Sequence, residues 1–375
     1  SGYLEEFKSD DGLWITGPSQ DSSSWKWAEP DWEGYNPAIT ENAWFTDLPE
    51  GVAGYEEDSW IQSPCFDLSN LDRPMIRMDI MKSFSGTGGA VIQYRSGSQQ
   101  PWRTLGSDEP GIGWYNNDNI QIDGVSMKGW GWDLSNPDQQ WITAAQSLKE
   151  LPSESLVTFR ILSGIKGADG SGNQGFAMDN LELVERAKLA VLEHFTNSSD
   201  NASKSADEAV DEFASSRIDE IIDLQYHMEY PGDDPMNLNN PSPPSTRSFN
   251  YGIPQVPYAV LDGGFSEDYR FDFSELKATP NLEMARMLTL QEPQFNIDVE
   301  VNWLSGSLEA TTEIACKVDR YDNNIQLYVV VIETNVTQYT GTNGDNEFRN
   351  VVLDMVPSAA GTLLGDNWRK GDSDL

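Results

Sequence analysis

Several residue types are scarce in this chain, and each scarcity excludes a class of protein. The only two cysteines, Cys65 and Cys316, exclude a disulfide framework, and each is expected to be a small buried hydrophobe. The only two histidines, His194 and His227, exclude a histidine-rich zinc site and the His-Glu-x-x-His helix of metalloproteases. They fall on neighbouring predicted strands and are interpreted as structural residues. The chain also lacks a Gly-x-Ser-x-Gly elbow and a phosphate-binding loop.

Basic residues and long apolar runs are scarce as well. The chain has 24 lysines and arginines against 61 aspartates and glutamates, a formal net charge of −37. Such a charge repels nucleic acid and anionic membrane faces, which excludes both as expected partners. No apolar run reaches the roughly 20 residues of a membrane-spanning helix, so an integral membrane protein is not expected. No secretory leader is visible, and the opening Ser-Gly-Tyr-Leu-Glu-Glu-Phe leads us to expect a mature or trimmed product.

The length of 375 residues predicts two or three domains, and the first of them is aromatic and rich in turns. Eleven of the 13 tryptophans fall within residues 1–187. Short alternating segments, such as 75–81 and 90–94, are separated by Gly, Ser, Asn and Pro. Many short strands with such punctuation predict an all-β sandwich.

The motifs of this first domain resemble a MAM-like, concanavalin-type jelly roll, a module of secreted surface proteins of Bacteroidota. They are Ser24-Trp25-Lys26-Trp27, Ala43-Trp44-Phe45-Thr46-Asp47-Leu48, Ser63-Pro64-Cys65-Phe66-Asp67-Leu68-Ser69, Ala90-Val91-Ile92-Gln93-Tyr94, Trp114-Tyr115-Asn116 and Gly175-Phe176-Ala177-Met178-Asp179-Asn180-Leu181. The resemblance implies an adhesive or accessory β-sandwich, in some members glycan-binding and often with a structural calcium ion.

Two pairs of residues in this domain are candidate ligands. Calcium takes six to eight oxygens, and Glu6 on the first strand could meet Asp179 on the last if those strands pair. The alternative is that both are ordinary strand-end carboxylates. Trp130 and Trp132 alternate with glycines, which predicts a loop or sheet edge where they could stack on sugar rings; the alternative is that they are core residues.

From residue 188 the pattern becomes α/β. An apolar strand over 189–195 leads to a polar turn and a helix predicted over 205–214, with Ser205 and Glu208 as its capping box. A second strand over 221–226, a helix near 245–251, a strand ending in the glycines of 256–264 and a helical patch over 283–290 follow. This alternation predicts a mixed sheet flanked by helices.

The second domain resembles the outer membrane protein 28 family, thioredoxin-like surface proteins of Bacteroidota. The motifs are Glu193-His194-Phe195-Thr196-Asn197, Leu224-Gln225-Tyr226-His227, Tyr230-Pro231-Gly232-Asp233-Asp234-Pro235-Met236, Tyr251-Gly252 and the segment from Val256-Pro257 to Gly264. The resemblance implies a cis-proline at Pro257. Where many relatives carry Cys-x-x-Cys, this chain has Asp200-Asn201-Ala202-Ser203. Neither Asp200 nor Ser203 can act as a thiolate, so thiol–disulfide exchange is not expected.

From Pro293 the pattern returns to strands, and an immunoglobulin-like sandwich is predicted. The predicted organisation is therefore a jelly-roll β-sandwich at 1–187, a thioredoxin-like domain without Cys-x-x-Cys at 188–292, and an immunoglobulin-like β-sandwich at 293–375. The last domain is expected to continue further or to be completed by a partner.

The function expected from these patterns is non-enzymatic binding or adhesion. The chain would be extracellular or on the cell surface, associated with the outer membrane as an accessory subunit of an assembly with protein partners. The first alternative is a glycan-binding component of a polysaccharide-utilising system. The second is an enzyme, either a residual thiol–disulfide protein or a hydrolase.

Overall fold

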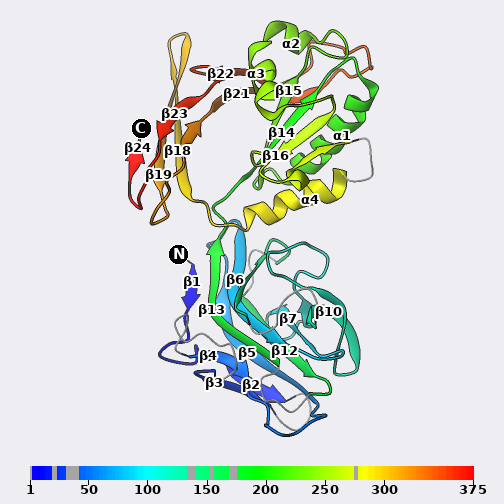
Figure 1. Ribbon diagram of the computed structural model, residues 1–375, viewed down its shortest axis with the longest axis vertical. Coiled ribbons are helices and arrows are strands. Elements are labelled where there is room, and N and C mark those ends of the chain that lie inside the picture. Colours follow the sequence, from blue (N-terminus) through cyan, green and yellow to red (C-terminus); the bar gives the residue numbers. More distant parts are fainter. Residues whose placement is uncertain are drawn as a thin grey trace. The chain divides into compact units, whose positions relative to one another are not determined.

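The computed structural model describes residues 2–18, 23–30, 42–132, 140–151, 156–168, 175–273 and 278–375 (Figure 1). The chain forms two compact units, Ser1–Arg186 (unit 1) and Ala187–Leu375 (unit 2). The division lies one residue from the predicted boundary at 187/188. No helix in the described residues is long and apolar enough to span a membrane.

Unit 1 contains two antiparallel sheets packed around one aromatic core. The first sheet has the order β11 (Ile142–Ser147), β6 (Pro74–Ser83), β13 (Gly175–Glu185), β4 (Ala43–Thr46) and β3 (Trp25–Ala28), and β1 (Tyr3–Glu5) also pairs with β13. The second has the order β2 (Ile15–Pro18), β5 (Glu57–Asp67), β12 (Leu156–Ile165), β7 (Gly89–Ser96), β10 (Val125–Gly131) and β9 (Asn117–Ile122), and β8 (Arg103–Thr104) pairs with β7.

The core of unit 1 follows from period-two alternation along its strands. In β5, buried and less buried residues alternate from Glu57 to Pro64, which is the pattern of a strand with one face on a core. Met78 of the first sheet and Ile61 and Phe159 of the second belong to the same buried cluster. The prediction of a two-sheet β-sandwich for this region is therefore confirmed. The expectation that both cysteines are buried is wrong for Cys65, which is exposed, whereas Cys316 is buried.

Unit 2 is built on a mixed six-stranded sheet of order β17 (Arg270–Asp272), β16 (Tyr258–Leu261), β14 (Ala190–Thr196), β15 (Ile221–His227), β22 (Phe348–Val356) and β21 (Val329–Val336). Strand β14 is parallel to β15, with α1 (Asn201–Ser215) between them in the chain, and antiparallel to β16. Side chains of α1 and α4 (Ala278–Thr289) share a buried cluster with β14. Tyr251 of α3 (Ser242–Tyr251) packs on the opposite cluster, which includes Phe195 and Tyr226.

The C-terminal strands differ from the predicted separate sandwich at 293–375. Strand β22 pairs with β15 in parallel, with Val351 opposite Gln225, so that β21 and β22 extend the sheet of the α/β part. The remaining strands form a three-stranded sheet, β18 (Phe295–Leu304), β19 (Ser307–Cys316) and β24 (Ser373–Asp374), and a pair, β20 (Ile325–Leu327) with β23 (Thr362–Gly365). The short elements α2 (Pro235–Asn239) and η1 (Glu267–Tyr269) complete unit 2.

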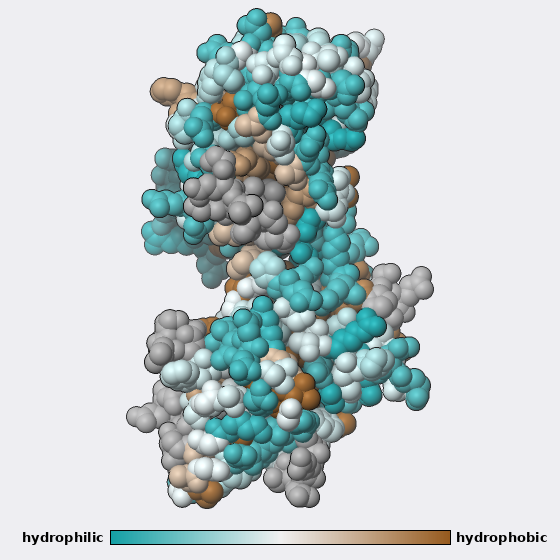
Figure 2. Space-filling view, turned by 90° about the vertical axis from the view of Figure 1, so that its right-hand side faces the viewer, coloured by the Kyte–Doolittle hydropathy of each residue, from teal (hydrophilic) through white to brown (hydrophobic). Residues whose placement is uncertain are grey.

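Hydrophilic side chains cover most of the face shown in Figure 2, as the excess of acidic residues leads one to expect. Apolar side chains on this face occur mainly as small separate spots.

Candidate functional site

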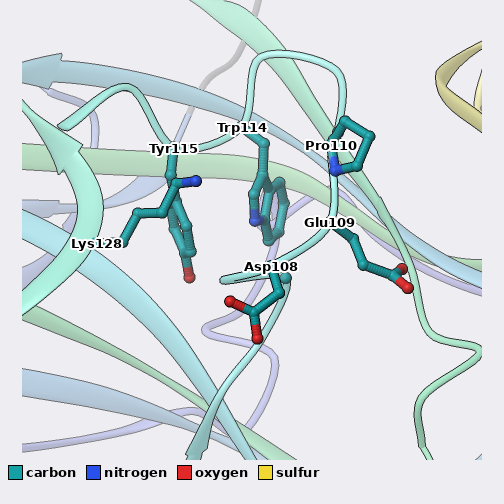
Figure 3. Close-up of a pocket in the computed structure, with 8 residues that line it drawn as sticks. Asp108, Glu109, Pro110, Trp114, Tyr115 and Lys128 are labelled. Carbon is teal, nitrogen blue, oxygen red and sulfur yellow. The ribbon is translucent and has the colours of Figure 1, made fainter. Parts of the chain in front are cut away.

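A cavity of about 320 Å³ lies in unit 1 beside the segment that joins β8 to β9. Figure 3 shows the rings of Trp114 and Tyr115 side by side, with Lys128 next to Tyr115 and Asp108 near one end of both rings. Aromatic, acidic and basic groups therefore surround one hollow. The lining residues are Gly106, Asp108, Glu109, Pro110, Gly111, Trp114, Tyr115 and Lys128.

The two aromatic rings are held in place by the core beneath them. Their centroids lie 5.3 Å apart, and each ring packs edge-on against Trp130, at 4.9 Å for Trp114 and 4.8 Å for Tyr115. The Tyr115 hydroxyl donates to the carbonyl oxygen of Ile92 and accepts from its N–H, both at 3.1 Å. Burial raises the pKa of Tyr115, so this hydroxyl stays protonated. The aromatic wall is pre-organised.

Glycine lets the loop backbone pass close to the aromatic wall. Gly106 has φ +63°, and a Cβ there would lie 2.4 Å from Nε2 of Gln146 and 2.7 Å from Nε1 of Trp114. Any larger residue would therefore clash as well as adopt a disfavoured backbone conformation. The buried Gln146 holds the other side of the loop by donating from Nε2 to the carbonyl oxygen of Glu109 at 3.1 Å.

Two polar groups beside the cavity are shielded from solvent. The indole N–H of Trp114 is buried and has no hydrogen-bond partner within the described parts of the chain. Glu150, which accepts from the Gly106 N–H at 3.2 Å, has a pKa raised mainly by burial and further by the nearby carboxylates of Glu109 and Asp108. Carboxylates that accept, a lysine ammonium that donates and fixed ring faces together suit an uncharged, hydroxyl-rich ligand.

The structure separates the two tryptophans that the sequence analysis selected as sugar-stacking residues. The expectation of a surface position is wrong for Trp130, which is completely buried, donates from Nε1 to the Gly113 carbonyl oxygen at 3.0 Å and packs on Phe176. Close approach of neighbouring backbone explains the flanking Gly129, since a Cβ there would lie 2.4 Å from the carbonyl oxygen of Ala90. Trp132, directly after β10, is 45% exposed and does not line the cavity.

The strands that carry the predicted calcium ligands pair as the prediction requires, with Glu5 opposite Leu181. Asp179 is buried and accepts from the N–H of Asn180 at 2.8 Å, whereas Glu6 is exposed and lies 3.5 Å from the Lys8 ammonium. No cluster of three or more histidine, cysteine or acidic side chains suited to a metal ion occurs in the described residues. Calcium at Glu6 and Asp179 stays a prediction.

In unit 2, the turn at which the family resemblance implies a Cys-x-x-Cys pair forms a helix cap instead. Asp200 is the N-cap of α1, and its Oδ2 accepts from the N–H of Ser203 at 2.8 Å and from its Oγ at 2.9 Å. The helix therefore begins four residues before the predicted capping box, and Ser205 is an exposed residue within it. The peptide bond between Val256 and Pro257 is cis, the isomer expected at this position.

The two histidines lie on adjacent strands and are both buried. His227 Nδ1 lies 2.9 Å from Asp234 Oδ2, and His194 Nε2 lies 3.5 Å from Asp207 Oδ1. Burial lowers the pKa of His194 to about 3, with repulsion from His227 as the second cause, so His194 is neutral at ordinary pH.

Sequence reasoning did not select Asp108, Glu109, Tyr115 or Lys128. Trp114 and Tyr115 were named only as part of the family motif Trp114-Tyr115-Asn116, without a binding role. A usable signal was present: adjacent carboxylates and an aromatic pair lie in one glycine- and proline-containing segment, which predicts a loop.

No family model matches the chain, and no curated protein matches it significantly. Among solved structures, similar ones include the K1 cleaved adhesin domain of Lys-gingipain from Porphyromonas gingivalis W83, at 12% identity and TM-score 0.30 over 49% of this chain and 98% of that one. The C-terminal family 22 carbohydrate-binding module of Clostridium thermocellum Xyn10B matches at 11% identity and TM-score 0.27 over 49% and 92%. The family 11 carbohydrate-binding module from Clostridium thermocellum, in complex with a beta-1,3-1,4-mixed-linked tetrasaccharide, matches at 14% identity and TM-score 0.27. This match covers 48% of this chain and 95% of that one.

Proposed function

We propose that this chain is a non-catalytic binding protein of an extracellular or cell-surface system, and that the cavity of unit 1 binds a carbohydrate. The observation that carries the proposal is a cavity in which the fixed rings of Trp114 and Tyr115 stand beside the carboxylates of Asp108 and Glu109. A sugar hydroxyl both donates and accepts, so a sugar ring suits a cavity lined by the Asp108 carboxylate and the Lys128 ammonium. The volume of about 320 Å³ is at the lower end of the range for small-ligand pockets, which suits one or two sugar units.

The arrangement of the carboxylates supports binding rather than hydrolysis. A glycosidase needs two carboxyl groups that face each other across the scissile bond. In Figure 3 the side chains of Asp108 and Glu109 point in different directions instead. Lys128, whose ammonium lies 3.8 Å from Oδ1 of Asp118, adds a donor to the rim. We infer that the ligand is held and released unchanged.

The experiment is a glycan array with the full chain, followed by calorimetric titration of any glycan that binds. Asp108→Asn should weaken binding about tenfold or more, because a hydrogen bond to a charged group contributes about 1.5–3 kcal/mol. Trp132→Ala is the matched control, since this exposed tryptophan lies outside the cavity, and it should leave binding unchanged. Failure of every glycan to bind would overturn the proposal. If Trp132→Ala abolished binding and Asp108→Asn did not, the sugar site would lie at Trp132, as the sequence analysis expected. Release of new reducing ends would show that the chain is an enzyme.

For unit 2 we propose a thioredoxin-like domain of the outer membrane protein 28 type that has lost its redox function. The parallel β14–α1–β15 arrangement, the antiparallel β16 and the position of Pro257 before β16 support it. The side chain of Asp200 occupies the helix N-terminus where the thiolate of a relative would lie. Insulin reduction should stay at background for this chain and rise in Asp200→Cys/Ser203→Cys. Activity in the unaltered chain would contradict the loss of function, and an inactive double variant with a normal melting temperature would contradict the assigned turn.

A further inference from the structure

Strands β18 and β19 form a long hairpin (Figure 1). One face of this hairpin is apolar and exposed. Ten residue pairs, from Phe295 opposite Cys316 to Leu304 opposite Ser307, keep it in one regular register. Because side chains alternate between faces, every second residue of β18 lies on the same side. Those residues are apolar and largely exposed: Ile297 is 59%, Val299 58%, Val301 50% and Trp303 84% exposed. A contiguous exposed apolar face of this kind indicates a binding surface.

The opposite face of the same hairpin is acidic. It carries Asp298 and Glu300 from β18 and Glu309 and Glu313 from β19, and the sequence has no lysine or arginine between Arg286 and Lys317. Asp298 lies directly opposite Glu313, and like charges in such a pair are destabilising. Basic side chains placed beside these carboxylates would relieve that repulsion.

One long edge of the hairpin is unpaired. In the part of the chain that the structure describes, β18 pairs only with β19, while β24 pairs with β19 at Ile314 and Ala315 alone. Strand β18 thus offers a ten-residue row of backbone donors and acceptors to an added strand.

The apolar face also borders a cavity of about 760 Å³ within unit 2. Ile297, Val299 and Ile314 line one side of it, and Leu224 and Val330 of the six-stranded sheet line another. A strand added beside β18 would point alternate side chains in the same direction as Ile297 and Val299, and therefore toward this cavity. The cavity gives those side chains apolar surface to bury.

We propose that β18 receives one extended strand of a partner protein in which apolar and basic residues alternate. The apolar residues would cover the exposed face, the basic residues would pair with Asp298 and Glu300, and the backbone would complete the β18 edge. A second copy of this chain does not fit, because pairing of two β18 strands would bring the carboxylates of both copies together on one face, in chains of net charge −37. The complementary pattern defines the partner.

The test is titration of the full chain with a ten-residue peptide of alternating lysine and valine, as long as β18. One control peptide has the same composition in scrambled order, and another has glutamate in place of lysine. The alternating lysine peptide should bind at least about tenfold more tightly than either control, as expected from several favourable cross-strand pairs. Methylating the backbone nitrogens of one set of alternate residues should abolish binding, whereas methylating the other set should not, because a strand edge uses every second N–H.

Variants of the chain locate the site. The double variant Asp298→Lys/Glu300→Lys should no longer bind the lysine peptide and should bind the glutamate peptide instead. The control Glu212→Lys reverses an exposed charge on α1 and should change neither affinity by more than about twofold. Equal binding of the scrambled peptide, or an unchanged affinity in the double variant, would overturn the proposal by showing unspecific charge attraction. Dimerisation in sedimentation experiments that Val299→Asp abolishes would also overturn it, in favour of a second copy.

Discussion

The buried ion pair between β14 and α3 allows a quantitative test of how unit 2 is stabilised. Arg247 donates from Nε to Glu193 Oε1 at 2.8 Å and from Nη2 to Oε2 at 2.7 Å, and both side chains are less than 10% exposed. The Tyr251 hydroxyl donates to the same carboxylate. The guanidinium also lies over the ring of Tyr328, 4.4 Å from its centroid. Glu193 is thus fully satisfied only while Arg247 is present.

The perturbation is Arg247→Met, which keeps the apolar stem and removes the charge. It leaves the Glu193 carboxylate buried with one partner, and breaking a buried pair in this way costs about 3–5 kcal/mol. For a unit of this size the melting temperature should fall by roughly 10 °C. The double variant Glu193→Leu/Arg247→Met should lose much less, because neither charge is then buried alone.

Calorimetry of the full chain measures this loss, and tryptophan fluorescence supplies an internal control. Eleven of the 13 tryptophans lie in unit 1, so the fluorescence transition should not move while the unit 2 transition does. Arg320→Met is the matched surface variant, since the Arg320 side chain is 71% exposed and its pair with Asp322 should contribute at most about 1 kcal/mol. A loss in Arg247→Met no larger than that of Arg320→Met would refute the reasoning, as would equal losses in the single and double variants.

Other predictions concern the cap of α1 and the pH dependence of unit 2. Asp200→Ala should lower the free energy of unfolding by about 1 kcal/mol, whereas Ser205→Ala should not lower it; urea unfolding decides which residue caps the helix. Burial raises the pKa of Asp223 from 3.8 to about 7, so the free energy of unfolding should decrease as the pH rises from about 4 to about 7. At pH 8, the variant Asp223→Asn should therefore be more stable than the unaltered chain. The pKa of His194 is about 3 in the folded chain and 6.5 in the unfolded chain, so burial of the neutral ring stabilises the fold above pH 6.5. This stability is lost as the pH falls toward 3. His194→Phe should therefore make the melting temperature less sensitive to acid.

The sequence predicts the β-sandwich of unit 1 because its information is local. Period-two alternation and turn residues recur along residues 1–187, and each strand can be read without knowing its neighbour. The expected pairing of the first and last strands needed the family resemblance. The helix start was misplaced for a local reason: Ser205 and Glu208 satisfy the capping-box spacing, but the carboxylate of Asp200, five residues before the predicted start, accepts from the N–H of Ser203 and caps the helix.

The role of each tryptophan could not be predicted from its neighbours in the sequence. Glycines around Trp130 suggested exposure, yet they mark close packing: Gly129 lies against the backbone of Ala90, and Gly131 lies against the side chain of Ile120. Trp114 carries no such signal, and its place at a cavity depends on β10, which lies later in the chain and supplies Trp130 beneath it and Lys128 beside it. Such non-local packing is absent from any single sequence window.

Non-local pairing also explains why the predicted third domain is divided. The residues of β21 and β22 were expected in an independent sandwich, but β22 pairs with β15, which lies more than a hundred residues earlier in the chain. Once β21 and β22 belong to the central sheet, the hairpin of β18 and β19 lacks the strands that would cover its apolar face. The exposed face is therefore a direct consequence of the sheet order. This connects the fold to the proposed partner, because the alternation of apolar and polar residues along β18 is the pattern that an added strand must complement.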